Sequence, residues 1–259
     1  PAPLIFLCHN VFPHEPFPLS RPLTKMALSQ ADKFIVQAVT ESSKLKDLFP
    51  DKEVIQTNHP LYTAFQEKTI EREIAREYLS ASPEERIVLF FGIVRRYKGL
   101  KYLIEAIPYV VRQISCQFYI VGEFYEDEAA YLAQIRRANV EKYVTIINRY
   151  VPNEEVSYYF TACDIVVLPY EDATQSGIIP LAFAFDRPVI TTRVGGLPKM
   201  VQHGLTGFLV APKNPEALAQ AILAFYREAR STEFRDHIRK AKKEYSWDKI
   251  VKIIEEIAD

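Results

Sequence analysis

The feature of this 259-residue sequence that most constrains its fold is a series of short apolar runs separated by helix-like segments. Strands that consist almost entirely of Val, Ile, Leu and Phe are buried on both faces, as in a parallel sheet covered by helices. The sequence therefore predicts an α/β fold with a doubly wound parallel sheet. The predicted strands cover residues 4–8, 34–36, 54–56, 87–91, 117–121, 144–147, 165–168, 188–191 and 208–210.

Helical spacing of apolar residues separates these strands, and it divides the chain into parts. A charged, helix-like stretch at residues 65–85 lies between a first short α/β run and a second, longer one. We predict a partial N-terminal domain at 1–75, a complete C-terminal domain at 76–245 and a tail helix at 246–259. The other predicted helices lie near 23–29, from 40 onward, and at 102–114, 126–139, 154–162, 178–185 and 215–229.

Charge and cysteine content exclude several classes of protein. With 32 Lys and Arg against 33 Asp and Glu, the net charge of −1 gives no general attraction to nucleic acid. Cys8, Cys116 and Cys163 are far apart, which argues against a disulfide framework or a zinc site and favours a reducing, cytoplasmic setting. No apolar run reaches the roughly 20 residues of a membrane span. A peripheral contact at the inner face of the membrane stays open.

Loops that follow the strands are the first place to look for a ligand site, because open parallel sheets bind ligands at the carboxyl ends of their strands. The loop from Gly92 to Leu100 contains two glycines and three cations (Arg95, Arg96 and Lys98) before a predicted helix. Helix-start amides together with Arg and Lys favour a diphosphate. The alternative is a solvated basic loop.

Two further strand ends carry small and polar residues. Thr174-Gln175-Ser176-Gly177 predicts a helix cap whose N–H groups point at a second phosphate, and Glu171 and Asp172 precede it as acceptors for sugar hydroxyls. A cap without a ligand is the alternative. The third loop contains Gly195-Gly196, and Gly204 and Gly207 follow it, which indicates tight turns or a close backbone approach.

In this order, the motifs resemble glycosyltransferase family 4, the group 1 glycosyltransferases. The resemblance rests on the Gly92 loop ending in Lys98-Gly99, on the strand and loop at 164–177, on Arg187-Pro188-Val189-Ile190, and on the glycines at 195–196 and 204–207. His9-Asn10-Val11 and Ser246-Trp247 extend it to the flanks. The resemblance implies a GT-B fold, in which an N-terminal acceptor domain faces a C-terminal donor domain. It also implies that the part of the acceptor domain before His9 is absent from this chain.

The resemblance also implies roles for individual residues. Lys98 matches the phosphate-binding lysine, and we expect Arg95 to replace the family arginine, whose place Ile93 occupies. Gly92, Gln175, Ser176 and the amides of Gly177 and Ile178 are expected around the diphosphate, and main-chain groups of Tyr150 and Val151 at the base. His9 is expected to face the donor sugar across the cleft, although a loop histidine bonded to its neighbours is the plain alternative.

The chain departs from the family at two glutamates. Alignment on Arg187-Pro188 places Ala173 and Leu181 where the family has carboxylates near the donor sugar and the ribose. Glu171 or Gln175 is expected to substitute for the first, and ribose recognition must come from elsewhere. The Thr-Gln-Ser-Gly version of the loop resembles a known subgroup of the family.

The activity implied is retaining transfer of a sugar from a UDP- or GDP-linked donor to a glycan or lipid-linked acceptor, without a metal or cofactor. The leaving diphosphate is expected to help take the acceptor proton. A nucleotide-sugar 2-epimerase is a weaker alternative, because a dense set of acid/base residues is missing. A non-catalytic nucleotide-sugar-binding or scaffold protein is the second. Three explanations of the short N-terminal part stay open: truncation, a second polypeptide that completes the domain, and loss of transfer activity.

Overall fold

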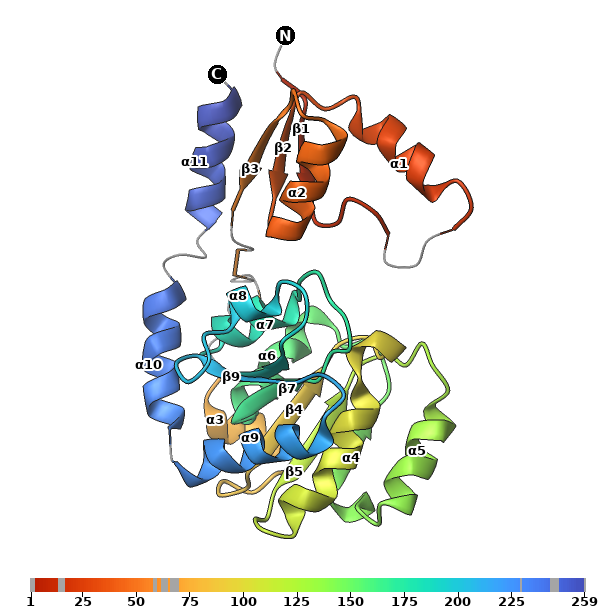
Figure 1. The fold of residues 1–259 in the computed structure, drawn as a ribbon. Helices are drawn as coiled ribbons and strands as arrows, with labels where there is room; N and C mark the ends of the chain where they lie inside the picture. The colour runs from red at the N-terminus through yellow and green to blue at the C-terminus, as the bar shows by residue number, and fades with distance from the viewer. Residues whose placement is uncertain are drawn as a thin grey trace. The chain divides into compact units, whose positions relative to one another are not determined.

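The computed structural model describes residues 3–13, 17–57, 60–61, 65, 70–228, 230–242 and 247–258. Contacts divide the chain into two compact units (Figure 1). Unit 1 comprises Pro1–Pro60 together with Lys243–Asp259, and unit 2 comprises Leu61–Lys242. Each unit has its own hydrophobic core, so the two are described separately.

Unit 1 is built on a three-stranded parallel sheet in the order β1-β2-β3. Its core contains Phe34 and Val36 of the central strand, with Leu28 and Leu45 from the two helices that follow β1 and β2. A buried Glu41 accepts a hydrogen bond from the Val11 N–H (2.6 Å) and thereby fixes the loop after β1. The elements are β1 (Ile5–Cys8), α1 (Ser20–Leu28), β2 (Lys33–Val36), α2 (Val39–Leu48) and β3 (Glu53–Gln56).

The C-terminal helix α11 (Trp247–Ala258) belongs to unit 1, although the whole of unit 2 precedes it in the chain. Ile250 and Ile257 of this helix are buried. Lys33 at the start of β2 donates from its Nζ to the carbonyl of Ile257 (2.9 Å), where a cation stabilises the carboxyl end of a helix.

Unit 2 contains a six-stranded parallel sheet in the order β6-β5-β4-β7-β8-β9. From the central strand β4 the chain adds β5 and β6 on one side, and it then returns to add β7, β8 and β9 on the other. The order therefore reverses between β4 and β7. The strands are β4 (Ile87–Phe91), β5 (Gln117–Val121), β6 (Val144–Ile147), β7 (Ile165–Leu168), β8 (Val189–Thr192) and β9 (Gly207–Val210).

Helices cover both faces of this sheet, which is why its central strands are apolar throughout. Val88 and Phe90 of β4 lie in a core with α4, α5 and α9, whereas Phe91 contacts Phe160 of α6 on the other face (4.9 Å between ring centroids). The α-helices of unit 2 are α3 (Arg72–Tyr78), α4 (Leu100–Val111), α5 (Glu128–Arg137), α6 (Asn153–Ala162), α7 (Ile178–Ala184), α8 (Leu197–Met200), α9 (Pro215–Arg227) and α10 (Ser231–Ala241), and η2 (Arg96–Lys98) and η3 (Glu141–Tyr143) are 3-10 turns.

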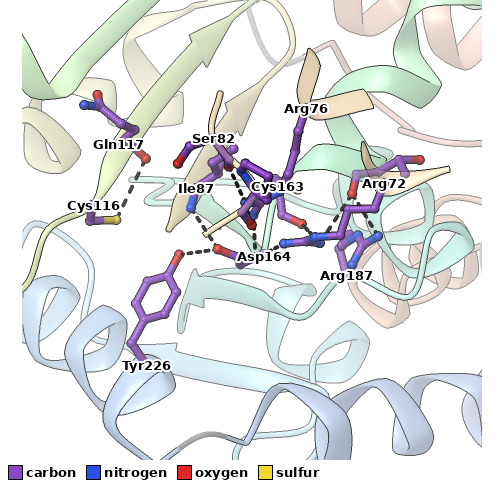
Figure 2. Close-up of polar contacts among 12 residues, drawn as sticks. Arg72, Arg76, Ser82, Ile87, Cys116, Gln117, Cys163, Asp164, Arg187 and Tyr226 are labelled. Carbon is purple, nitrogen blue, oxygen red and sulfur yellow. Dashed lines mark hydrogen bonds and ion pairs between the residues drawn. The ribbon is translucent and has the colours of Figure 1, made fainter. Parts of the chain in front are cut away.

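Asp164, directly before β7, joins four segments at the amino end of the sheet (Figure 2). Its carboxylate accepts from the Ile87 N–H (2.8 Å) and from the Tyr226 hydroxyl (3.1 Å), and it pairs with Arg72 and Arg76 of α3. The aspartate that begins the apolar motif at 164–169 thus holds the fold together. It lies at the opposite end of β7 from the ligand loops.

The contacts place the division between the units at residues 60/61, earlier than the sequence-based boundary at 75/76. That boundary falls inside α3. Arg72 and Arg76 of this helix donate to main-chain carbonyls of Cys163 (3.2 Å) and Ser82 (2.8 Å), which ties α3 to unit 2. The contacts also place the predicted tail helix in unit 1.

Each predicted strand is present within one residue of its predicted ends, and the predicted doubly wound α/β class is confirmed. The helix-like stretch at 65–85 is shorter than predicted, since α3 ends at Tyr78. Ser80 has a left-handed backbone (φ 54°), which terminates a right-handed helix. Helix α10 was not predicted. It is strongly charged, and only Phe234 and Ile238 are buried.

Candidate functional site

The candidate site lies where the strand order of unit 2 reverses, at the carboxyl ends of β4 and β7. In an open α/β sheet the loops on either side of such a point diverge and leave room for a ligand. Here these loops are residues 92–99 after β4 and 169–177 after β7. They contain most of the residues that the sequence singles out.

Glycines let these loops approach one another closely. A Cβ on Gly99, which has φ +67°, would lie 2.0 Å from the carbonyl oxygen of Pro169. A Cβ on Gly195 (φ +47°) would lie 1.6 Å from the carbonyl oxygen of Ala173. Main-chain hydrogen bonds hold the contact, from Glu171 N–H to the Tyr97 carbonyl (2.7 Å) and from Gly196 N–H to the Thr174 carbonyl (3.1 Å). The loops after β4, β7 and β8 therefore form one packed assembly.

Lys98 is the buried cation of this assembly, with 9% of its surface exposed. Its Nζ lies against Gly92, since a Cβ there would be 3.2 Å away, and it lies 6.0 Å from the centroid of the Tyr170 ring. Burial, reinforced by the charge of Arg95, lowers the pKa of Lys98 to about 8. In the described part of the chain, no carboxylate forms an ion pair with Lys98, so its charge is available to an anionic ligand.

Arg95 is the second cation of the site. It is half-buried, and its guanidinium lies 4.9 Å from the centroid of the Tyr125 ring. The charge of Arg95 acts on Lys98, so both cations belong to this site, and their binding to phosphate stays a prediction. The positive charge of Arg95 disfavours the charged form of Lys98 and contributes to its lowered pKa.

The start of α7 differs from the prediction. We expected the N–H groups of both Gly177 and Ile178 to be unused, but the Ile178 N–H donates to Ser176 Oγ (3.2 Å). For Ile178 that expectation is wrong, because the buried Ser176, directly before the N-cap residue Gly177, accepts a hydrogen bond from this N–H. Ser176 Oγ also lies 3.3 Å from the Tyr170 hydroxyl. Contacts of Gln175, Ser176, Gly177 and Ile178 with a ligand stay predictions.

Glu171 forms two ion pairs. Lys101 of α4 lies 3.0 Å from one carboxylate oxygen, and Lys213 of the loop before α9 lies 3.3 Å from the other. Burial by itself would raise the pKa of Glu171, but Lys101 and Lys213 outweigh it and lower the pKa below its ordinary value. Glu171 is therefore ionised at neutral pH, and it connects three segments around the site.

The predicted base-contacting residues follow β6, at the same edge of the sheet. Tyr150 is 68% exposed, whereas Val151 is buried. Arg149 donates to Glu155 of α6 (3.2 Å), which fixes the start of this loop. Since β6 is two strands from β4, the ends of the two strands are about 10 Å apart along the sheet edge.

His9 lies in unit 1, after β1. Its Nδ1 is 2.9 Å from the side-chain carbonyl oxygen of Gln37, which follows the neighbouring strand β2. His9 thus occupies the carboxyl edge of its own sheet. Its expected role opposite the donor sugar stays a prediction.

Ala173 and Leu181 occupy the positions of the two family glutamates, and both are buried (3% and 5% exposed). Leu181 is one of the buried residues of α7. Neither position presents a polar group to a ligand.

Sequence analysis did not identify Tyr170, which is 2% exposed and contacts both Ser176 and Lys98. Thr192 of β8 donates from its hydroxyl to the Tyr170 carbonyl (2.7 Å) and holds this residue in place. Its position directly after the apolar strand and Pro169 was a usable signal.

The described residues were searched for metal-binding groups and for membrane-spanning helices. Among them, no group of three or more His, Cys, Asp or Glu side chains could hold a metal ion, and independence of metals stays a prediction. The helices within the described ranges include none with the length and apolar character needed to cross a membrane.

Comparison with known proteins places the chain in a family. The family model described as "Glycosyl transferases group 1" matches residues 85–228, which include β4 to β9 and the loops of the candidate site. The chain belongs to the group 1 glycosyltransferases, so the predicted resemblance to this group is confirmed.

Individual relatives agree with this assignment. An uncharacterised glycosyltransferase of Methanocaldococcus jannaschii is 30% identical over 185 residues, covering 68% of this chain and 45% of the relative. A D-inositol 3-phosphate glycosyltransferase of Corynebacterium glutamicum is 29% identical over 208 residues, covering 74% and 49%. The chain thus spans about half the length of the curated relatives it matches.

The fold is of the GT-B type. The structure of HepE from Anabaena in complex with UDP superimposes with a TM-score of 0.80 at 20% sequence identity, covering 98% of this chain and 71% of HepE.

Proposed function

We propose that unit 2 binds a nucleoside diphosphate sugar through Lys98 and Arg95, and that the complete protein transfers the sugar with retention of configuration. The observation that carries this proposal is the buried Lys98 at the strand-order reversal, with a pKa lowered to about 8 and no carboxylate partner in the described residues. A diphosphate between Lys98 and Arg95 would relieve their repulsion and compensate the burial of the charge.

UDP or GDP is the proposed carrier, and a glycan or lipid-linked molecule the proposed acceptor. The UDP complex of HepE supports UDP, since HepE shares this fold over nearly the whole chain. The base would lie along the sheet edge at Tyr150 and Val151. The chain spans about half the length of its relatives. The proposed acceptor, and any second polypeptide, therefore concern the complete protein and not this chain alone.

The proposed chemistry is stabilisation of the leaving diphosphate. As the bond to the sugar breaks, negative charge grows on the phosphate oxygens, and Lys98 and Arg95 are already in place to balance it. One well-aimed donor of this kind contributes about 3 kcal/mol to catalysis. Two cations at the diphosphate make a metal unnecessary in this proposal. Glu171 is ionised and acts as an acceptor for sugar hydroxyls or a positioning group, because it has no proton to donate at neutral pH.

We place the protein in the cytoplasm. Cys8, Cys116 and Cys163 are all free and buried, which suits a reducing compartment.

The test is calorimetric titration of the purified chain with UDP, GDP and ADP. One nucleotide is expected to bind with micromolar affinity, and Lys98→Ala to weaken that binding by about 10²-fold, since a charged hydrogen bond contributes about 1.5–3 kcal/mol. Arg96→Ala is the matched control, because Arg96 is exposed in the same turn and loses the same charge. Equal affinities in the two variants would contradict the proposed site.

A non-catalytic nucleotide-sugar-binding protein is the second candidate. Two observations favour it: Ala173 and Leu181 are buried, and Glu171 already forms two ion pairs. In the described loop after β7, the exposed Asp172 is then the one carboxylate outside an ion pair that could contact the sugar. Hydrolysis of the nucleotide sugar by the purified chain separates the two. Hydrolysis that is lost in Lys98→Ala would support the transferase, whereas tight binding without hydrolysis would support the binding protein.

A further inference from the structure

A second cationic cavity lies in unit 2, at the opposite end of the sheet from Lys98. It has a volume of about 310 Å³ and lies between α3, the segment leading into β4, the end of α9 and the start of α10. Four arginines line it, namely Arg72, Arg76, Arg86 and Arg235. The cavity is at the amino ends of the strands, so it is separate from the proposed nucleotide-sugar site.

Only one carboxylate pairs with these arginines in the described part of the chain. Asp164 pairs with Arg72 and Arg76, as Figure 2 shows. Arg86 contacts the Ser115 carbonyl (3.4 Å) and lies over the Tyr226 ring. Glu84 and Glu85 also line the cavity, but the described residues include no ion pair between either of them and these arginines. Four arginines against the three carboxylates of Asp164, Glu84 and Glu85 leave the lining with one net positive charge.

Arg235 is the arginine of this cavity whose charge is least compensated by the described residues. It lies in α10 and is half-buried, and none of the described residues gives it a hydrogen-bond acceptor or an ion-pair partner. Its Nε is buried and unsatisfied, and so is the Nε of Arg76, a side chain that is only 3% exposed. Burial and then the charge of Arg72 lower the pKa of Arg235. Arg76 still has Asp164 and main-chain carbonyls as partners, so the arrangement points to a missing partner for Arg235.

The start of α10 adds main-chain donors to the same cavity. Ser231, the first residue of this 11-residue helix, lines the cavity, and no side chain caps the helix start. The N–H groups of the first helical turn have no partner within a helix, and they attract anions.

We propose that this cavity binds a small phosphorylated ligand, either inorganic phosphate or the phosphate group of a monoester, through Arg235, Arg76 and the first turn of α10. The planar guanidinium groups match the geometry of phosphate oxygens. The volume is at the lower end of the range for ligand pockets, which suits a phosphate with a small organic group rather than a nucleotide. Among the described residues Arg235 makes no hydrogen bond or ion pair, so its guanidinium group is the one we expect to bind the phosphate.

The experiment is calorimetric titration of the full chain with inorganic phosphate and, separately, with glycerol 3-phosphate. It is carried out on the Lys98→Ala chain, so that phosphate at the nucleotide-sugar site does not contribute. We expect binding that Arg235→Gln weakens by at least about tenfold, the effect of losing one charged hydrogen-bond donor. Arg239→Gln, on the same helix but paired with Asp186 outside the cavity, is expected to bind within about twofold of the parent, as exposed ion pairs contribute little.

The titrations distinguish a phosphorylated metabolite, free phosphate and the absence of a site. Tighter binding of glycerol 3-phosphate would identify a metabolite ligand, and equal binding would identify free phosphate; both support the site. No binding of either probe, or equal weakening in both arginine variants, would overturn it. Arg235→Gln without ligand is expected to melt no lower than the parent chain, because it removes a half-buried charge that has no partner among the described residues. A marked loss of stability would assign Arg235 to the fold and also overturn the proposal.

Discussion

At the scale of single residues, Lys98 carries the strongest functional information. An ordinary lysine is exposed and charged, whereas Lys98 is only 9% exposed and lies beside another cation. Its ammonium group loses hydration without gaining a carboxylate, so its pKa falls to about 8 instead of 10.5. A residue held in this state is unfavourable for the empty protein and favourable for a complex with an anion.

Binding of a diphosphate should be accompanied by proton uptake at Lys98. A bound diphosphate stabilises the charged form of Lys98 and raises its pKa again, so binding at pH 8 should take up about half a proton, and binding at pH 6.5 almost none from this group. Calorimetry of UDP binding in buffers with different ionisation enthalpies measures the uptake. Lys98→Arg is the control, since guanidinium stays protonated at both pH values and no uptake is expected. Uptake in Lys98→Arg equal to that of the parent would contradict the assignment.

The lowered pKa of Lys98 also makes the free energy of unfolding depend on pH. Between pH 8 and pH 10.5 the unfolded chain holds a proton on Lys98 that the folded chain has lost. The contribution of Lys98 to the free energy of unfolding therefore rises with pH across this window and is least favourable below pH 8. Urea unfolding at several pH values, compared with Lys98→Met, isolates this contribution.

At the scale of elements, the site depends on how closely three loops pack. The sequence shows glycines at 99, 195 and 196, but glycine is equally common in turns that touch nothing. Only the sheet order brings the loop after β4 against the loop after β7, and the loop after β8 against Ala173. The glycines are required because a Cβ would overlap a main-chain oxygen there.

Two glycines with similar backbone conformations test this explanation. Gly99 (φ +67°) faces the Pro169 carbonyl, whereas a Cβ on Gly204 (φ +78°) would meet no other atom within 4 Å. Gly204→Ala should lower the free energy of unfolding by about 1 kcal/mol, the cost of a left-handed backbone alone. Gly99→Ala should cost about 1–3 kcal/mol more and should also weaken UDP binding, because the loop that carries Lys98 must shift. Equal effects in urea unfolding would show that close packing is not the reason for Gly99.

At the scale of the whole molecule, two hydrophobic cores define two units, and the chain leaves unit 1 and returns to it. The single tryptophan, Trp247, lies in α11 of unit 1, so its fluorescence reports on that unit. Far-ultraviolet circular dichroism is dominated by unit 2, which contains most of the helices and strands.

These two probes should separate the unfolding of the units. Asp164→Asn removes the charge that pairs with Arg72 and Arg76, and it should destabilise unit 2 by about 3 kcal/mol. We expect the circular dichroism transition to shift and the Trp247 transition to stay in place, because separate cores unfold separately. Asp236→Asn, an exposed residue of α10, is the control and should change neither. One shared transition that moves in both probes would contradict this division.

The fold class, the positions of the strands and the family could all be predicted from the amino-acid sequence. Buried parallel strands need apolar residues on both faces, and this pattern is local enough to read at Ile87–Phe91 or Ile165–Leu168. It also determined which loops to examine, because ligands bind at the carboxyl ends of such strands.

The contacts of the side chains at these loops could not be predicted and came from the three-dimensional structure. It assigned the Ile178 N–H to Ser176, paired Glu171 with Lys101 and Lys213, placed Asp164 and its arginines at the far end of the sheet, and added Tyr170 to the site. It also placed α3 in unit 2 and α11 in unit 1. These outcomes depend on contacts between residues far apart in the chain, and local sequence patterns carry no information about such contacts.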